Sequence, residues 1–426
     1  MSPRLADPGP VPARHAPPRV LIAGASLGGL RAAEQLRAAG WHGAITVVGA
    51  EPHMPYNRPP LSKEVLAGRV PFDSLAFTPR PSTADVEWRI GRPVAAVRLH
   101  ERVAVLEGGE EIPFTGLVAA TGLRPRRLAR PGPAGPLSGR HVLRTISDAR
   151  SLHTTLTRPG ARLVVVGAGF IGCEVAATAV ALGVRDVTVV DVVPLPMLRP
   201  LGEPLARALL ARHLARGVRF VLGAGVAAFT GEERVRGVLL DDGRELAADV
   251  VVECVGARPN TEWLAGNGLD LTDGVLTDEQ LRTPGAPHAV AVGDVARFPD
   301  VRYGGPARRV EHWSMPGDSA RYAARTLVAQ LAGEKRESAP FAPLPSFWSD
   351  QHDFRIQSFG SPELGTGDIR VVEGDPDGDR GDGGDVVAEY RADGRLVGVV
   401  ALGGPAAAAA AARYRARLVQ QPAPLA

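Results

Sequence analysis

The chain has 426 residues, enough for two or three domains of ordinary size. Its formal net charge at pH 7 is +3, and no dense run of Lys and Arg interleaved with aromatic residues occurs, which argues against nucleic-acid binding. No apolar run approaches the roughly 18–20 residues that span a bilayer, and residues 1–18, rich in Pro, Ala and Arg, are expected to form a disordered tail rather than a secretory signal.

Cysteine usage argues against a disulfide-rich or zinc-binding protein. The two cysteines, Cys173 and Cys254, lie far apart, and no CxxC, CxxxxC or Cys/His cluster occurs. So few cysteines are typical of a reducing compartment, and we expect a cytoplasmic protein without a metal ion or membrane contact. The histidines show no triad or ligand spacing, and we assign them no chemistry.

Two similar units stand out in chain order. A short apolar strand at residues 19–23 is followed by a glycine-rich turn, an Ala-rich helix and a second strand at 44–49. The same succession recurs between strands at 162–166 and 186–191. Continuous Val/Ile/Leu runs are typical of buried parallel strands joined by a helical crossover. The sequence therefore predicts two nucleotide-binding units in one α/β chain.

The regions around the second unit indicate where the chain passes between domains. Pro- and Gly-rich stretches at residues 124–136 and 158–160 are places where such crossings can lie. Further apolar strands are expected at 250–255 and 289–292.

Beyond about residue 340 the pattern changes to alternating, strand-like segments at 354–359, 385–390 and 396–402. An Ala/Arg helix is expected over 405–419, so this part is predicted to be a third, α+β domain. Its acidic Gly-rich loop at 373–385 lacks the ordered alternation of ligands that a calcium-binding loop needs.

The second glycine turn contains Gly167, Gly169 and Gly172 in the spacing of a dinucleotide-binding fingerprint. In such a turn the first Gly makes the bend, the second lets the backbone approach a pyrophosphate, and the third lets helix and strand pack closely. Asp191 ends the next strand, where a carboxylate accepts hydrogen bonds from a ribose 2′-hydroxyl and repels a 2′-phosphate. No Arg follows immediately, so the pattern favours NADH over NADPH.

The first glycine turn contains Gly24, Gly28 and Gly29 but has Ser26 where the middle glycine belongs. Serine is small, and its hydroxyl can donate to a phosphate, so the turn is still expected to bind a nucleotide. Glu51, just beyond the following strand, is the candidate ribose acceptor. Two such units in one chain are a far more specific signal than one, but the glycines do not tell which nucleotide each unit binds.

Residues 55–63, Pro-Tyr-Asn-Arg-Pro-Pro-Leu-Ser-Lys, resemble the segment after the first nucleotide-binding unit in ferredoxin reductases of the putidaredoxin-reductase and rhodocoxin-reductase type. The match continues in the family's order with residues 120–122, 167–174, 255–260, 292–294, 311–313 and 347–351. It covers nearly the whole chain after residue 18. The departures are Ser26 and Asn57, where many relatives carry Asp.

The resemblance implies an α/β fold with two Rossmann-like dinucleotide-binding domains and a C-terminal α+β domain. The FAD-binding domain would comprise residues 19–130 and 251–339, interrupted by an NADH-binding domain at 131–250, and the C-terminal domain would cover 340–426. The first glycine turn would then bind FAD and the second NADH.

The resemblance also implies which residues contact the cofactors. Asp294 would hold the ribitol or pyrophosphate of FAD, and the backbone of Trp313 would meet the pyrimidine edge of the flavin. Arg58, Val94 and Arg144 are expected to be further FAD contacts. The remaining expected cofactor contacts are Lys63, Thr121, Gly122, Ile171, Gly256 and Gly293.

Lys63 and Glu174 are the expected catalytic pair beside flavin N5. Lys63 follows the FAD-binding unit, and Glu174 lies on the first turn of the helix in the NADH-binding unit. A buried ammonium needs a paired carboxylate, because an isolated buried charge is costly. A cation near N5 and O4 would favour the negative charge that the flavin gains when it receives a hydride from NADH.

The missing dithiol indicates the kind of acceptor. Disulfide reductases of this fold place a CxxxxC beside the flavin, where this chain has Tyr56 to Lys63, and Cys173 and Cys254 are expected to be packing thiols. The flavin would therefore pass single electrons to a 2Fe–2S ferredoxin, whose usual acidity suits the Arg-rich excess, and the ferredoxin would feed a haem-thiolate monooxygenase. Trp348 can line this route or simply pack in the core.

Two alternatives stay open at this point. The same fold can serve another acceptor, as in a monodehydroascorbate-, rubredoxin- or nitrite-reductase-type protein or one like apoptosis-inducing factor. Alternatively, the chain can be a redox sensor that holds FAD and NADH without turnover. We expect a monomer or a weak homodimer.

Overall fold

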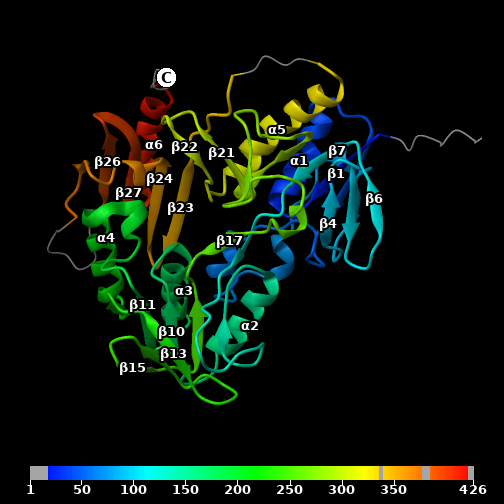
Figure 1. Ribbon diagram of the computed structural model, residues 1–426. Coiled ribbons are helices and arrows are strands. Elements are labelled where there is room, and N and C mark those ends of the chain that lie inside the picture. The colour runs from blue at the N-terminus through cyan, green and yellow to red at the C-terminus, as the bar shows by residue number, and fades with distance from the viewer. Residues whose placement is uncertain (1–17, 335–338, 377–383, 421–426) are drawn as a thin grey trace, which may run out of the picture.

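The computed structural model describes residues 18–334, 339–376 and 384–420, and it contains two largely parallel sheets that lie in different parts of the molecule (Figure 1). The predicted tail at residues 1–18 lies outside the described residues except for residue 18, and so does the middle of the predicted acidic loop at 373–385. Among the helices that are described, none has the length and apolar character needed to cross a membrane.

The first sheet carries the first predicted nucleotide-binding unit at its centre. In spatial order its strands are β19 (Arg282–Thr283), β20 (Ala286–Ala291), β7 (Gly116–Ala119), β1 (Arg19–Ala23), β2 (Ala44–Val48) and β3 (Glu87–Arg89). All pair in parallel except β19, which is antiparallel to β20. Because β20 comes from far along the chain, this sheet is built from two separate stretches of sequence.

The second sheet carries the second unit and is parallel throughout. In spatial order its strands are β12 (Arg219–Leu222), β11 (Asp186–Asp191), β10 (Arg162–Val166), β16 (Val250–Glu253) and β9 (Arg140–His141). Since β16 belongs here, the expected return to the FAD-binding part at residue 251 is too early, and the chain crosses back only after Glu253. An apolar strand by itself does not tell which of two parallel sheets it joins.

Five helices pack on these sheets, namely α1 (Leu27–Ala38), α2 (Ile146–Leu156), α3 (Phe170–Ala181), α4 (Leu198–Ala215) and α5 (Met315–Leu331). α1 and α5 lie against each other beside the first sheet. α3 is largely apolar because it packs between two cores. Val175 and Ala179 join the core of the second sheet, and Cys173 joins the core of the C-terminal domain.

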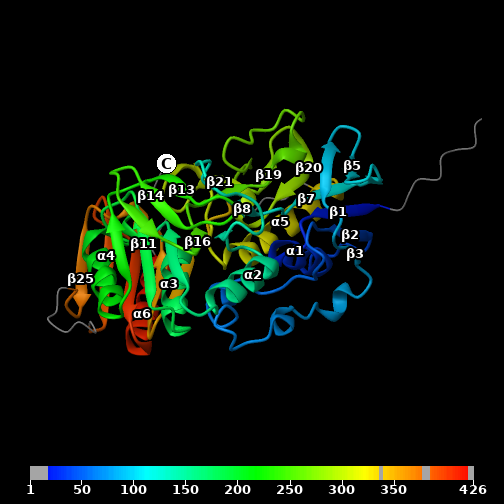
Figure 2. The same ribbon diagram turned by 90° about the horizontal axis from the view of Figure 1, so that it is seen from below.

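The C-terminal domain is an antiparallel sheet of β23 (Ser346–Gln351), β24 (Phe354–Gly360), β27 (Arg395–Gly403), β26 (Val386–Ala392) and β25 (Ile369–Glu373). α6 (Pro405–Gln420) covers one face, and α3 and α4 pack on the other. Figure 2 shows these helices together at one end of the molecule, with α1 and the first sheet at the other. The predicted fold class is confirmed.

Smaller elements complete the fold. Two three-stranded sheets consist of β4 (Val94–Arg98), β5 (Val103–Leu106) and β6 (Glu111–Pro113), and of β13 (Val226–Thr230), β14 (Gly237–Leu240) and β15 (Glu245–Ala247). A third contains β18 (Val275–Leu276), β21 (Ala296–Asp300) and β22 (Gly305–Arg308). Short 3-10 turns lie at η1 (Pro59–Ser62), η2 (Phe72–Leu75), η3 (Pro81–Thr83), η4 (Glu262–Leu264), η5 (Gly293–Val295) and η6 (Pro362–Leu364).

The two crossings between the parallel sheets pair with each other. β8 (Leu123–Pro125) leads out of the first sheet, β17 (Ala257–Pro259) leads back, and the two strands are antiparallel partners. Beside them, Thr121 Oγ1 donates to the carbonyl oxygen of Asn260 at 2.6 Å, and Asn260 Nδ2 donates to the carbonyl oxygen of Thr121 at 2.9 Å. This two-stranded ribbon therefore fixes where the two parts meet.

Candidate active site

A continuous cavity of about 1610 Å³ lies where the two parallel sheets and the C-terminal domain meet. An ordinary small-ligand pocket has roughly 300–1,000 Å³, so this cavity has room for two nucleotide cofactors side by side. Both glycine turns line it, and β23 contributes Phe347 and Trp348. All the predicted site residues lie in its lining except Gly29 and Gly172, which sit behind the turns.

Steric limits require glycine at the first and third fingerprint positions of both turns. Gly24 has φ of 119° and Gly167 has φ of 109°, a region that L side chains rarely adopt. A Cβ on Gly29 would stand 1.9 Å from the carbonyl oxygen of Gly24, and one on Gly172 would stand 1.9 Å from that of Gly167. The two turns are therefore built alike, and these glycines serve the close packing of helix on strand.

The middle position explains why Ser26 is tolerated. Ser26 has φ of −104° and ψ of −163°, and Gly169 has φ of −82° and ψ of −168°, so both have an extended backbone that any residue can adopt. A Cβ on Gly169 would meet nothing within 4 Å, because this position faces the open cavity. Since α1 and α3 begin directly after these residues, each turn presents free helix N–H groups to that space and fits a pyrophosphate.

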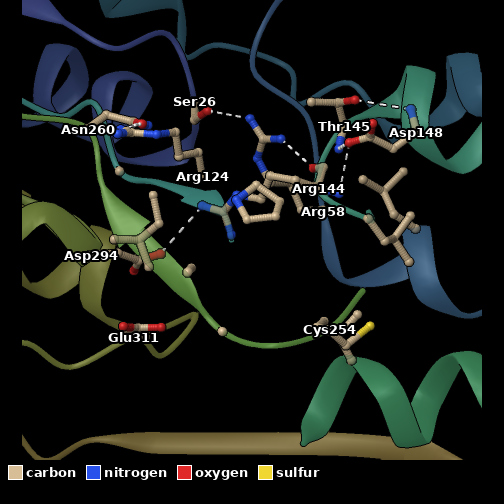
Figure 3. Close-up of a pocket in the computed structure, with 18 of the residues that line it drawn as sticks. Ser26, Arg58, Arg124, Arg144, Thr145, Asp148, Cys254, Asn260, Asp294 and Glu311 are labelled. Atoms are coloured by element: carbon tan, nitrogen blue, oxygen red, sulfur yellow. Dashed lines mark hydrogen bonds and ion pairs between the residues drawn. The ribbon is translucent and has the colours of Figure 1, made fainter. Parts of the chain in front are cut away.

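Arg58 connects the first glycine turn with the acid beyond the next strand. Its Nη2 donates to Ser26 Oγ at 2.7 Å (Figure 3) and to Glu51 Oε1 at 2.6 Å. Tyr56 donates its hydroxyl to Glu51 Oε2 at 2.6 Å, and its ring lies 4.8 Å from the Arg58 guanidinium carbon. Burial raises the pKa of Tyr56, so this hydroxyl stays a donor. The predicted residues Ser26, Glu51 and Arg58 thus form one connected group.

Arg144 and Asp294 point toward each other across the cavity (Figure 3), with 3.6 Å between Arg144 Nη2 and Asp294 Oδ2. Burial raises the pKa of the Asp294 carboxyl, the Arg144 charge opposes that rise, and the nearby Glu311 adds to it. Burial likewise lowers the pKa of Arg144. Each charge is therefore stabilised chiefly by the other, in a position that suits the polar chain of a bound dinucleotide.

The predicted catalytic pair is present as a buried ion pair. Lys63 Nζ lies 2.7 Å from Glu174 Oε2, with side-chain exposures of 11% and 4%. Ser62 Oγ donates to the same carboxylate oxygen at 2.5 Å, and Lys63 Nζ also donates to the Pro59 carbonyl oxygen at 3.1 Å. Lys63 directly follows η1, and Glu174 lies on α3. The ion pair therefore connects the two nucleotide-binding units.

Trp313 and Asp191 also line the cavity. The Trp313 side chain is 43% exposed, its ring centroid lies 5.5 Å from that of Trp348, and its Nε1 donates to Asn57 Oδ1 at 3.2 Å. Asp191 Oδ2 accepts from the backbone N–H of Ala168 at 2.6 Å. This carboxylate therefore stands at the second glycine turn, as predicted.

Neither cysteine is a reactive thiol. Burial raises the pKa of Cys254 to about 12 and raises that of Cys173 as well, with the Glu174 charge adding to both shifts. Both thiols are therefore protonated at neutral pH and poor nucleophiles. Among the described residues, no group of three or more His, Cys, Asp or Glu side chains is arranged to hold a metal ion.

Sequence reasoning missed the polar residues behind the catalytic pair, Ser349, Gln351 and His213. A signal was available for two of them, because Ser349 and Gln351 alternate with Phe347 and so share its core-facing side of a strand. A second signal was the scarcity of lysine: of 49 Lys and Arg residues only Lys63 and Lys335 are lysines. Lys63 is therefore an unusual choice of cation in this Arg-rich chain.

A family model described as pyridine nucleotide-disulphide oxidoreductase matches residues 18–320, and one described as reductase C-terminal matches residues 346–425. The chain belongs to the pyridine nucleotide-disulphide oxidoreductase family. It is accordingly a flavin-dependent oxidoreductase with FAD and NADH as its cofactors, as its motifs implied.

Relatives and solved structures match over nearly the whole length. The ferredoxin reductase component of chlorobenzene dioxygenase from Cupriavidus sp. (strain PS12) is 38% identical over 417 residues, covering 96% of this chain and 95% of that protein. Rhodocoxin reductase from Rhodococcus erythropolis is 38% identical, covering 84% and 81%. The reductase in a covalent putidaredoxin reductase–putidaredoxin complex superposes with a TM-score of 0.84 at 31% identity, covering 94% and 93%. The resemblance inferred from the motifs is confirmed.

Proposed function

We propose that the chain is an NADH-dependent ferredoxin reductase that passes single electrons to a 2Fe–2S ferredoxin. When bound, FAD supplies the chemistry that takes two electrons from NADH and releases them one at a time. The observation that carries the proposal is the buried Lys63–Glu174 pair at 2.7 Å, in the lining of a cavity that both glycine turns share. Relatives over this length are named as ferredoxin reductases, which supports the acceptor.

The proposed role of Lys63 is electrostatic. Its ammonium lies in the cavity lining, desolvated and held by Glu174, where it stabilises negative charge on a ring system stacked beside it. Glu174 keeps this ammonium in place and offsets the cost of burying it. We assign the first glycine turn to FAD, because Arg58, Arg144 and Asp294 surround that side of the cavity, and the second turn to NADH.

The preference for NADH over NADPH rests on Asp191. Its carboxylate stands at the second turn, where it accepts a ribose hydroxyl and repels a phosphate. The next two residues are Val192 and Val193, which offer no charge to a 2′-phosphate. Arg199 also lines the cavity, and its positive charge would work in the opposite direction.

We propose an oxygenase as the final client. The expectation of a haem-thiolate monooxygenase stays a prediction, because the relatives at 38% identity include a component of a dioxygenase. We also propose a cytoplasmic location, since both cysteines are unpaired thiols.

The function is tested with the purified, FAD-loaded chain. NADH should bleach the flavin under anaerobic conditions, and NADH with a 2Fe–2S ferredoxin and cytochrome c should give sustained cytochrome c reduction. Ferricyanide serves as the acceptor that reports an active flavin independently of any partner. Turnover with ferricyanide but with no ferredoxin would favour an enzyme with another acceptor, and bleaching without turnover on either would favour a redox sensor.

A further inference from the structure

The second oxygen of the Glu174 carboxylate is held from the C-terminal domain. Oε2 faces Lys63 and Ser62, whereas Oε1 accepts a hydrogen bond of 2.6 Å from Ser349 Oγ on β23. Ser349 is fully buried and does not line the cavity, so it touches neither cofactor site. Its contact with the catalytic pair is made through Glu174 alone.

A line of buried polar groups continues behind Ser349. Gln351 Nε2 lies 2.9 Å from Ser349 Oγ, and Gln351 Oε1 lies 2.7 Å from His213 Nε2 on α4. His213 Nδ1 in turn lies 3.2 Å from His352 Nε2, in the turn between β23 and β24. Gln351 is 1% exposed and His213 is 0% exposed, so the middle of this line is shielded from solvent.

The direction of every hydrogen bond in this line follows from its first member. A carboxylate paired with an ammonium only accepts, so the single hydroxyl proton of Ser349 points to Glu174. The Gln351 amide must then donate to Ser349, and its carbonyl oxygen accepts from His213 Nε2–H. His213 Nδ1 is left as an acceptor for His352 Nε2–H, so the network assigns one tautomer to each histidine.

Burial keeps this line intact at neutral pH. It lowers the pKa of His213 to about 4 and that of His352 to about 3, with Arg216 lowering both and Asp353 opposing the shift of His352. A protonated His213 would lose its acceptor at Nδ1 and break the contact with His352. The charged and titratable groups around Glu174 itself are Lys63 and the thiols of Cys173 and Cys254.

We propose that Ser349, Gln351 and His213 are positioning residues that fix the Glu174 carboxylate and, through it, the Lys63 ammonium. All donors of the line point toward the carboxylate, and successive hydrogen bonds of this kind reinforce one another. The proposal rests on the proposed role of the Lys63–Glu174 pair. Its consequence is that the catalytic pair, which comes from the two nucleotide-binding parts, is set in place by the C-terminal domain.

The packing around the line makes this coupling rigid. Phe170 of α3 meets Phe347 of β23 edge-on at 4.9 Å between ring centroids, one turn of helix before Glu174. Cys173 of α3 and Leu209 of α4 share a core with Phe347 of β23. A shift of β23 relative to α3 would therefore move Ser349 and the carboxylate together.

The experiment compares Ser349→Ala with Ser358→Ala in the full, FAD-loaded chain. Ser358 is an equally buried serine on the neighbouring strand β24, and within the described residues its hydroxyl has no hydrogen-bond partner. Ser349→Ala should lower the limiting rate of flavin reduction by NADH about 10-fold, as expected for a small misplacement of a catalytic group, with the Kd for NADH unchanged. Ser358→Ala should change neither quantity.

A double-mutant cycle separates positioning from general stability. In a Glu174→Gln background, Ser349→Ala should slow flavin reduction no further, because its effect passes through the missing carboxylate. The same factor in both backgrounds, or equal rates for Ser349→Ala and Ser358→Ala, would overturn the proposal.

Two further outcomes are distinguishable. If Glu174→Gln itself leaves flavin reduction unchanged, the role of the catalytic pair is wrong rather than the line behind it. If Ser349→Ala fails to fold, Gln351→Leu tests the next link, where a roughly threefold loss of rate is expected because the serine hydroxyl still donates but is no longer oriented. An unaltered rate in that folded variant would equally overturn the proposal.

Discussion

At the scale of single residues, the proposed chemistry depends on charged side chains that lie in pairs. Lys63 and Glu174 form a buried pair, and Arg144 and Asp294 form a second pair whose side chains are 34% and 19% exposed. Removing one partner of a buried pair leaves an uncompensated charge, whereas removing both leaves only a packing defect. The two kinds of variant therefore report different properties.

Lys63→Met should slow flavin reduction by NADH about 100-fold, the loss typical of removing one electrostatic stabiliser, while FAD stays bound. It should also cost about 3 kcal/mol of unfolding free energy, because Glu174 is left buried and unpaired. Adding Glu174→Gln should recover most of that stability but none of the rate. Stopped-flow absorbance and urea unfolding measure the two quantities, and an unchanged rate in Lys63→Met would rule out the proposed role.

Asp191→Ser should weaken the discrimination between the two nicotinamide nucleotides. Losing a charged acceptor of about 1.5–3 kcal/mol should reduce the NADH preference in kcat/KM roughly 10- to 100-fold, chiefly through KM. Asp186→Ser, at the opposite end of β11 and paired with Arg219 at the surface, is the matched control. Equal effects of both substitutions would show that Asp191 has no specific role in recognition.

The candidate site was predicted better than its surroundings. Lys63, Glu174, Asp294 and the glycines carry motifs, and the structure brings them to one cavity. The alternation with Phe347 places Ser349 and Gln351 on the core-facing side of a strand, but a hydrogen bond between elements far apart in sequence leaves no spacing pattern that joins them to Glu174 or His213. Only the tertiary fold shows that a serine on β23 faces a carboxylate on α3.

At the scale of elements, the glycine turns of the two strand–turn–helix units differ at one of their three fingerprint positions, Ser26 against Gly169, and share the same steric limits at the other two. A Cβ on Gly29 or Gly172 would strike backbone that cannot move, whereas a Cβ at the middle position enters the cavity. The sequence alone therefore predicted both units correctly, but it could not place Val250–Glu253, because an apolar strand fits either parallel sheet.

The assignment of the turns can be tested with the third glycines. Gly29→Ala should yield a chain without FAD, and Gly172→Ala should yield a yellow chain that dithionite reduces but NADH does not. Gly317→Ala on α5, where a Cβ would meet nothing within 4 Å, should be neutral or stabilising by about 0.5–1 kcal/mol. Visible spectra measure the bound flavin, and the opposite pattern would exchange the two assignments.

At the scale of the whole molecule, three domains converge on one cavity, and imidazoles with lowered pKa values lie in their interior or in the wall of that cavity. Burial lowers the pKa of His141, His213 and His312 to about 4 in each case. Since the unfolded chain binds these protons near pH 6.5 and the folded chain does not, stability is lost as the pH falls through that window.

We therefore expect the unfolding free energy to fall between roughly pH 6.5 and 4, as these histidines become protonated in the unfolded chain. His141 is the best single test, because its Nε2 is buried and, in the part of the chain that is described, has no hydrogen-bond partner. His141→Phe should flatten the profile by up to about 2 kcal/mol at pH 5. Thermal unfolding at several pH values measures this, and a profile as steep as that of the parent chain would contradict it.

The paired crossings β8 and β17 limit how the cavity can open. The two strands are joined by backbone hydrogen bonds, so a motion that slides one strand along the other must break those bonds. Exchange of a nucleotide should therefore proceed by bending of the two-stranded ribbon as a unit. Rotation of one half against the other would break the backbone pairing of Arg124 with Arg258.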